Sequence, residues 1–206
     1  MKPFLNRIAA RSRDFIASDD AALSIEAAIM LPLLCAMYVS GYQFFDGYRR
    51  EAQIYKANYA VADLVTRQTK SDTITPVDLE GLQRVFETLT SSEDQSYMRF
   101  TEVRRNDDGI EVIWSYASDG QPGMTTARAQ GFLNQIPTLS HNERVVLVES
   151  YTYDAPFFSV GLDDRIIDVM IPISPRYHGC IPFTADPDPN AQPIGCQEKG
   201  PDPDSA

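Results

Sequence analysis

The sequence contains few of the residues from which enzyme active sites are usually assembled. His141 and His178 are the only histidines, and no GxSxG, HExxH or P-loop pattern occurs. The acidic residues are numerous but scattered, and they single out no catalytic pair. We therefore expect a protein that is not an enzyme and that has no catalytic residue, cofactor or metal site.

Basic residues are also in short supply. The 206 residues include 18 Lys and Arg against 29 Asp and Glu, which gives a net charge of −11 and a pI near 4.6. The basic residues do not cluster, whereas binding to nucleic-acid phosphates depends on grouped Lys and Arg side chains. This composition excludes nucleic acid as an expected partner.

Cysteine occurs only three times. Cys35 lies within a long apolar run, where we interpret it as a small packing residue rather than a lipidation or redox site. Cys180 and Cys196 flank a proline-rich segment, and in an oxidising compartment such a pair most simply forms a disulfide. A free-thiol or metal-binding interpretation stays open but is weaker, because a metal site needs about four ligands and only His178 lies nearby.

Charge is absent from residues 27–45, a run long enough to cross a hydrocarbon core of roughly 30 Å. This run is longer than the apolar part of a cleaved secretory signal, about 7–15 residues, and no convincing small-residue cleavage site follows it. We therefore expect one membrane-spanning helix. Lys2, Arg7, Arg11 and Arg13 precede the run, which favours a cytoplasmic amino terminus.

A single carboxylate, Glu26, stands at the head of this run. A charge costs roughly 2.5–3.5 kcal/mol at the bilayer centre and less near the interface, so a carboxylate at this position is expected to have a partner. The alternative is that Glu26 extends to the lipid headgroups in an ordinary signal anchor. Six residues later, Pro32 removes one helical hydrogen bond, which allows either a bend or a neutral kink.

The apolar run is expected to continue as one long helix, interrupted only by Pro32, because residues 46–69 contain no proline and show helical apolar spacing. A second helix is predicted over residues 76–90, with Thr75 as the N-cap and Pro76 at its first position. Its apolar stripe, which should dock on the first helix, consists of Leu79, Leu82, Val85, Phe86 and Leu89.

Beyond residue 98 the apolar period changes to two, which is typical of strands. Residues 100–105 and 110–116 are predicted to form a hairpin across Asn106 to Gly109. A short helix is expected over 125–135, and further strands over 143–153 and 165–173, the last at a sheet edge because it contains Pro172. The predicted fold class is α+β: a long amino-terminal membrane and stalk helix followed by a small antiparallel sheet packed with helices.

Residues 19–45, DDAALSIEAAIMLPLLCAMYVSGYQFF, resemble the TadE/TadF-like pseudopilins of tight-adherence (Flp) pilus systems in bacteria. That family shows a small residue, four mostly small or apolar residues, a Glu, and an apolar helix containing Pro. The resemblance implies that a prepilin peptidase cuts after Ala21, which would leave Ala22 as the new amino terminus and Glu26 as the fifth residue. The family most often has Gly where this chain has Ala21.

A physical argument agrees with this resemblance. Cutting creates an α-amino group, ordinarily with a pKa of about 7.7–8.0, whose cation can pair with the Glu26 carboxylate of a neighbouring subunit. Such a pair would set the register of assembly. The implied function is a minor pilin, anchored in the inner membrane with a periplasmic carboxy-terminal domain or located in an extracellular pilus. Its partners would be the prepilin peptidase, other pilus subunits and the inner-membrane assembly platform.

The alternative function is a permanently anchored periplasmic scaffold or sensor-like binding module that never enters a filament. Under either reading, four segments are expected. They are a basic leader at residues 1–21, a transmembrane helix at 22–45, an exported α+β domain at 46–180 whose helix covers 46–70, and a Pro-rich acidic tail at 181–206. The tail is expected to bury little and to be held, at most, by the cysteine pair.

Overall fold

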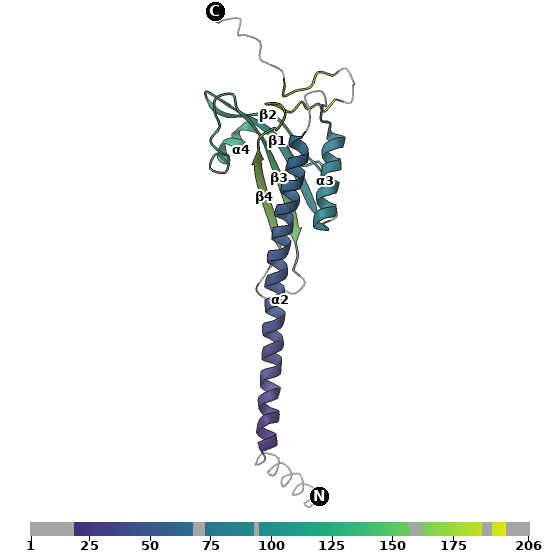
Figure 1. Ribbon diagram of the computed structural model, residues 1–206, viewed down its shortest axis with the longest axis vertical. Helices are drawn as coiled ribbons and strands as arrows, with labels where there is room; N and C mark the ends of the chain where they lie inside the picture. Colours follow the sequence, from purple (N-terminus) through teal and green to yellow (C-terminus); the bar gives the residue numbers. More distant parts are fainter. Residues whose placement is uncertain are drawn as a thin grey trace, which may run out of the picture. The chain divides into compact units, whose positions relative to one another are not determined.

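The computed structural model describes residues 19–67, 73–92, 95–156, 161, 163–186 and 191–196. Its contacts divide the chain into two compact units, Met1–Gly47 with Pro156–Asp163, and Tyr48–Ala155 with Asp164–Ala206. The helix α2, Asp19–Thr66, contributes residues to both units, and the sheet belongs to the second (Figure 1). Most of the expected leader lies outside the described residues.

The helix α2 presents different surfaces in the two units. Between Ser24 and Met37 every side chain is exposed. In the second unit the helix buries side chains at helical spacing, namely Ile54, Ala57, Asn58, Val61, Ala62 and Val65. The long helix predicted from the sequence is thus confirmed as far as Thr66, and residues 68–72 lie outside the described part. It continues through Pro32, so the expected interruption is absent.

The helix α3, Pro76–Thr90, has the predicted bounds and the predicted start. The Thr75 hydroxyl accepts a hydrogen bond from the Asp78 backbone, and the Asp78 carboxylate accepts one from the Thr75 N–H at 2.9 Å. The buried face contains Leu79, Gln83 and Phe86. Leu82 is partly buried against the same core, and two other members of the predicted stripe are exposed.

Those two residues, Val85 and Leu89, are 39% and 45% exposed. The prediction placed five apolar residues of α3 in one stripe, whereas the helix is rotated so that Gln83 faces inward. The glutamine is buried because its amide nitrogen donates to the Ser96 carbonyl at 3.1 Å and to the Asp119 carboxylate at 2.9 Å. These bonds replace the water that the amide nitrogen loses on burial.

The sheet is antiparallel, with strand order β2-β1-β3-β4. The predicted strands are confirmed with slightly different ends: β1 Ser96–Asn106, β2 Gly109–Ala117, β3 Arg144–Asp154 and β4 Arg165–Ile173. Gly109 ends the β1–β2 turn with φ of +128°, a conformation that L side chains rarely adopt. The strand with Pro172 is at an edge, as expected.

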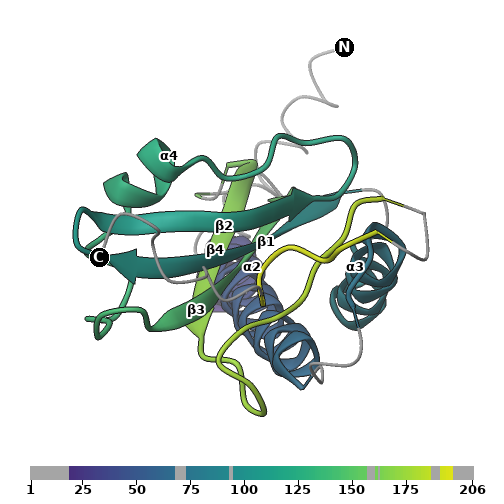
Figure 2. The same ribbon diagram turned by 90° about the horizontal axis from the view of Figure 1, so that it is seen from above.

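Each face of the sheet is covered by different elements. Figure 2 shows α2 and α3 on one face, and the short helix α4, Thr126–Gly131, on the other. The face toward α2 and α3 holds the larger apolar core, which includes Met98, Phe100, Val146 and Val148. The α4 face has a second, smaller core. We call these the helix face and the α4 face. The helix α4 is shorter than predicted and ends at a glycine, the residue typical of helix ends.

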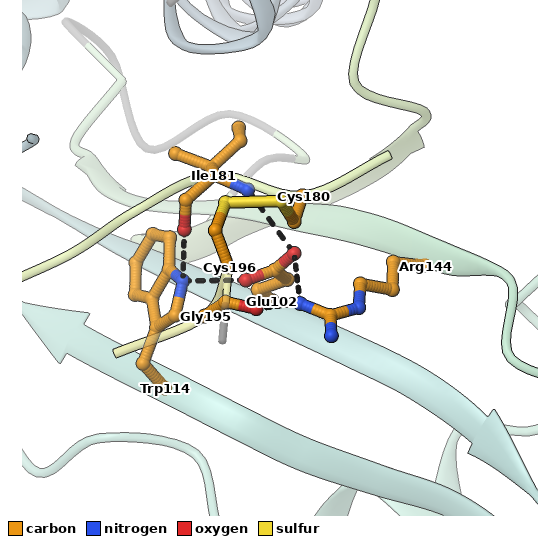
Figure 3. Close-up of a disulfide and its surroundings, with 7 residues drawn as sticks. All are labelled: Glu102, Trp114, Arg144, Cys180, Ile181, Gly195 and Cys196. Carbon is orange, nitrogen blue, oxygen red and sulfur yellow. Dashed lines mark hydrogen bonds and ion pairs between the residues drawn. A yellow bond between two sulfur atoms is a disulfide. The ribbon is translucent and has the colours of Figure 1, made fainter. Parts of the chain in front are cut away.

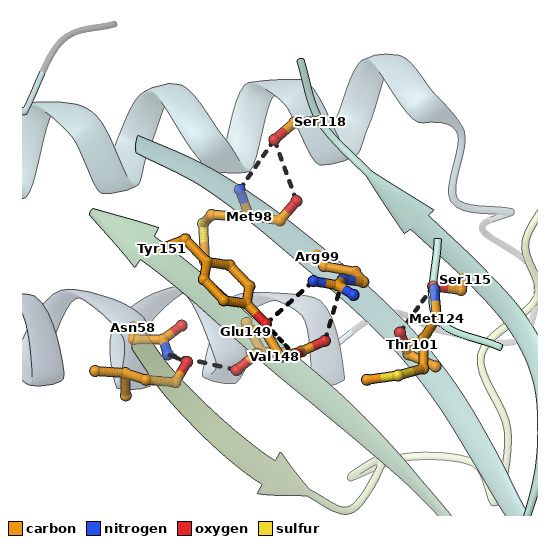
Figure 4. Close-up of polar contacts among 11 residues, drawn as sticks. Asn58, Met98, Arg99, Thr101, Ser115, Ser118, Met124, Val148, Glu149 and Tyr151 are labelled. Carbon is orange, nitrogen blue, oxygen red and sulfur yellow. Dashed lines mark hydrogen bonds and ion pairs between the residues drawn. The ribbon is translucent and has the colours of Figure 1, made fainter. Parts of the chain in front are cut away.

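A buried asparagine fastens α2 to the sheet. Asn58 is fully buried, and its amide donates to the carbonyls of Val169 at 3.1 Å and Val148 at 3.4 Å (Figure 4). The bonds therefore connect α2 to both β3 and β4. Because an unpaired buried N–H group costs free energy, these contacts favour the observed position of α2 on the two strands.

The expectation that residues from 181 onward bury little is wrong for the described part of that segment. Ile181 is 1% exposed and Phe183 is 4% exposed, and both belong to the larger core. Phe183 forms a parallel bridge with Ile74 and an antiparallel bridge with Ile194. We call residues 180–186 and 191–196 the strap. It is a layer of the core, which composition alone did not indicate because its few apolar residues are separated by proline and aspartate.

Candidate functional site: the amino-terminal helix and the carboxy-terminal strap

The amino-terminal part of α2 carries the residues that the sequence marked for processing and assembly. Ala21, Ala22, Glu26 and Pro32 all lie within this helix. Glu26 is exposed and is the only charged residue from Ser24 to Phe45. Among the described residues, one helix, Ser24–Thr66, is long and apolar enough to cross a membrane. None of its most apolar 18-residue stretch is buried.

A protein in water rarely exposes an apolar surface as large as this part of α2. Ile29, Leu31, Leu33 and Met37 are each at least 58% exposed. An apolar helix surface of this kind is suited to contact with lipid or with other helices. Glu26 then stands at one end of the apolar surface, as the sequence indicated.

The Cys180–Cys196 disulfide is formed, with the two Cα atoms 5.3 Å apart. It joins the two described pieces of the strap (Figure 3). Cys35, the third cysteine, is a free thiol in α2. The predicted disulfide is therefore confirmed, and its surroundings add a cluster that the sequence did not indicate.

That cluster is centred on Glu102 of β1, a fully buried carboxylate. Its Oε2 accepts a hydrogen bond from the Trp114 indole at 2.7 Å, and its Oε1 accepts one from the Ile181 backbone at 3.2 Å. The Arg144 guanidinium lies 3.6 Å from Oε1 and donates to the Gly195 carbonyl. Figure 3 shows these groups converging from β1, β2, β3 and the strap.

Burial raises the pKa of the Glu102 carboxyl above its usual value, although Arg144 and the two hydrogen bonds oppose the shift. A buried carboxylate is destabilising unless it is paired, and here both oxygens have partners. The same partners connect the strap to three strands. Glu102 thus connects the strap to the sheet.

An irregularity in the β1–β2 register brings Trp114 to Glu102. Glu102 pairs with Trp114, whereas the next residue, Val103, pairs with Val112, so Ile113 is the extra residue of a bulge. Without the bulge, Trp114 would point to the α4 face, because successive side chains alternate. On the helix face its ring stacks on Phe183, with centroids 4.7 Å apart. The alternating sequence of β2 gave no sign of this bulge.

The strap approaches Glu102 closely at Gly195. This residue has φ of +109°, and a Cβ atom there would lie 3.0 Å from Glu102 Oε2 and closer still to the Ile181 carbonyl. Only glycine fits, both for its backbone angle and for the available space. In the sequence, the only hint of this role is that Gly195 directly precedes Cys196. The need for glycine at position 195 becomes visible only when the strap lies against β1.

A second buried polar cluster lies on the α4 face. Arg99 of β1 and Glu149 of β3 are cross-strand partners, both nearly inaccessible, with Nε and Oε2 3.3 Å apart. The Tyr151 hydroxyl donates to Glu149 at 2.8 Å and accepts from Arg99 at 3.1 Å (Figure 4). Burial and the adjacent Glu149 raise the pKa of Tyr151 to about 12, so its phenol is neutral at physiological pH.

Among the described residues, no group of three or more His, Cys, Asp and Glu side chains is arranged to hold a metal ion. The chain was compared with protein-family models, with curated proteins and with solved structures. None of them matches it.

Proposed function

We propose that this chain is a minor pilin or pseudopilin: a non-enzymatic subunit, anchored in the bacterial inner membrane by α2, that takes part in assembling a Flp-type pilus. The observation that carries the proposal is the continuity of α2. Its first part is exposed, apolar and charged only at Glu26, and its second part is built into a folded domain. A helix of this design can pack against other subunits while the domain remains outside the bilayer.

The carboxylate gives this helix a means of selecting its partners. After cutting between Ala21 and Ala22, the new amino group of one subunit can neutralise Glu26 of the next. Pairing lowers the cost of each charge in an apolar environment, and an unpaired Glu26 would oppose close helix packing. The size of the folded domain supports a minor subunit, because a domain this large could not repeat densely along a thin fibre.

The first test is processing. Mass spectrometry of the membrane-extracted protein from cells that contain the peptidase should show Ala22 at the amino terminus. Retention of Met1 or Lys2 in such cells would contradict the proposal and would favour a permanently anchored scaffold or binding module.

The second test separates assembly from insertion. Glu26→Gln should insert at least as well as the wild type, because removal of a charge eases transfer into lipid, but it should recover less of the partner pilins in a detergent pull-down. Asp46→Asn is the matched control, since it removes a carboxylate of the same helix beyond the apolar run. Equal partner recovery by Glu26→Gln, with normal cleavage, would refute the pairing mechanism.

A further inference from the structure

A hollow of about 450 Å³ opens on the α4 face, near the end of the sheet where β1 begins and β3 ends. Residues from the start of β1 and the end of β3 line it, together with Ile166 of β4 and the segment that follows β2. Its volume falls within the range of small-molecule sites, about 300–1,000 Å³. All its lining residues belong to the second unit. Neither the disulfide nor the Glu102 cluster contributes to it.

Tyrosines form one wall of this hollow. Tyr97 and Tyr151 are cross-strand partners whose rings stack with centroids 4.6 Å apart. Tyr153 follows on β3, is 44% exposed, and its hydroxyl donates to Asp164 at 2.6 Å. The Arg99 guanidinium lies 5.3 Å from the centre of the Tyr151 ring. The stack and the hydrogen bonds hold these rings in place, so an apolar surface is present before any ligand binds.

The other wall is polar and carries little charge. Gln95 and Gln121 are exposed and offer amide donors and acceptors, and Asp119 offers a carboxylate. Asp119 is held at φ of +53° and accepts a hydrogen bond from the buried Gln83. Among the lining residues that the structure describes, it is the only one with a charge at neutral pH, because Tyr151 remains a neutral phenol.

We propose that this hollow binds a neutral saccharide ring. A pyranose has an apolar C–H face, which matches the tyrosine wall. It also has a perimeter of hydroxyl groups, which matches amides that donate and accept and a carboxylate that accepts. An anionic ligand would face Asp119, with no cation among the described lining residues to compensate. A purely aliphatic ligand would offer no hydrogen bonds to the side chains of Gln95 and Gln121.

The test is saturation-transfer NMR on the full-length protein in detergent, with glucose, galactose, N-acetylglucosamine and their disaccharides at millimolar concentration. Glucuronate serves as the charged counterpart of glucose. At least one neutral sugar should show transfer, and glucuronate should bind more weakly than glucose. Trp114, the only tryptophan, lies on the helix face, so its fluorescence reports folding without responding to this site.

Two exposed positions provide the variants. Tyr153→Ala and Gln121→Ala should each weaken binding about tenfold, through loss of a stacking surface and of hydrogen bonds. The matched controls are Tyr59→Ala on α2 and Gln130→Ala on α4, which remove the same side chains outside the hollow. These controls should bind as the wild type does.

Absence of transfer from every neutral sugar overturns the proposal. Transfer that survives both hollow variants, or that is equal for glucose and glucuronate, also overturns it. The result does not depend on pilus assembly, because binding is measured on the isolated protein. Failure here would therefore leave the proposed function standing, and failure of processing would leave the saccharide site standing.

Discussion

At the scale of single residues, Glu102 and Gly195 show how the strap is attached. The carboxylate is buried among donors from three different elements, and the glycine allows the strap backbone to reach it. Each depends on the other, since any side chain at position 195 would displace the Ile181 carbonyl or Glu102 itself. The absence of a side chain at Gly195 thus allows Glu102 to keep its hydrogen-bond partners.

Gly195→Ala should lower the free energy of unfolding by about 1–3 kcal/mol, because the backbone angle is unfavourable for alanine and the added methyl has no room. Denaturant unfolding followed by Trp114 fluorescence measures this change. Gly179→Ala is the control, since nothing lies within 4 Å of a Cβ atom at that position. Equal stability of the two variants would show that the strap can shift away from Glu102 without cost.

At the scale of elements, the strap completes a core that the helices and sheet leave open. Phe183 covers Trp114, and Ile181 adds a fully buried side chain beside Glu102. The strap has few regular backbone hydrogen bonds of its own beyond its bridges at Phe183. Its position therefore depends on the disulfide, the Glu102 cluster and these apolar contacts together.

The double variant Cys180→Ser, Cys196→Ser should be less stable by about 3 kcal/mol, the chain-entropy value for a loop of 16 residues. Trp114 emission should shift to longer wavelength as the strap loosens and water reaches the indole. A reducing agent should have the same effect on the wild type. Cys35→Ser, which removes the free thiol, should change neither property. An unchanged unfolding midpoint in the double variant would show that non-covalent contacts alone hold the strap.

At the scale of the whole molecule, one chain combines an exposed apolar helix with an acidic, disulfide-bonded domain. The two parts differ in the solvent that suits their surfaces, and α2 is one continuous helix that contributes residues to both. A stable disulfide favours an oxidising compartment for the domain, whereas the basic residues before the apolar run favour the cytoplasm for the amino terminus. A chain that crosses the membrane once would place the disulfide and the basic amino terminus in the compartments that each favours.

A protease added to spheroplasts should therefore digest the carboxy-terminal domain while cytoplasmic proteins stay intact. Alkaline carbonate should leave the undigested protein in the membrane fraction, because roughly 20 apolar residues hold it there. Protection of the domain until the cells are lysed would reverse the expected orientation. Release by carbonate would rule out a span.

The sequence by itself determined the features that rest on local periodicity and local chemistry. The absence of charge in residues 27–45 defined the apolar helix, and Thr75, Pro76 and Asp78 defined the start of α3. Alternation and turn residues located the four strands, and Pro172 placed β4 at an edge. These signals are readable because each depends on neighbours a few residues away in the chain.

Only the tertiary structure decided how distant residues meet. Contacts between segments far apart in sequence produce the bulge at Ile113 and the burial of the Gln83 side chain. They also bury Ile181 and Phe183. The Glu102 cluster and the tyrosine-lined hollow arise in the same way, from side chains of several elements. A buried polar group is stable only when its partners converge on it, and that convergence is a property of the packed sheet and strap rather than of any local pattern.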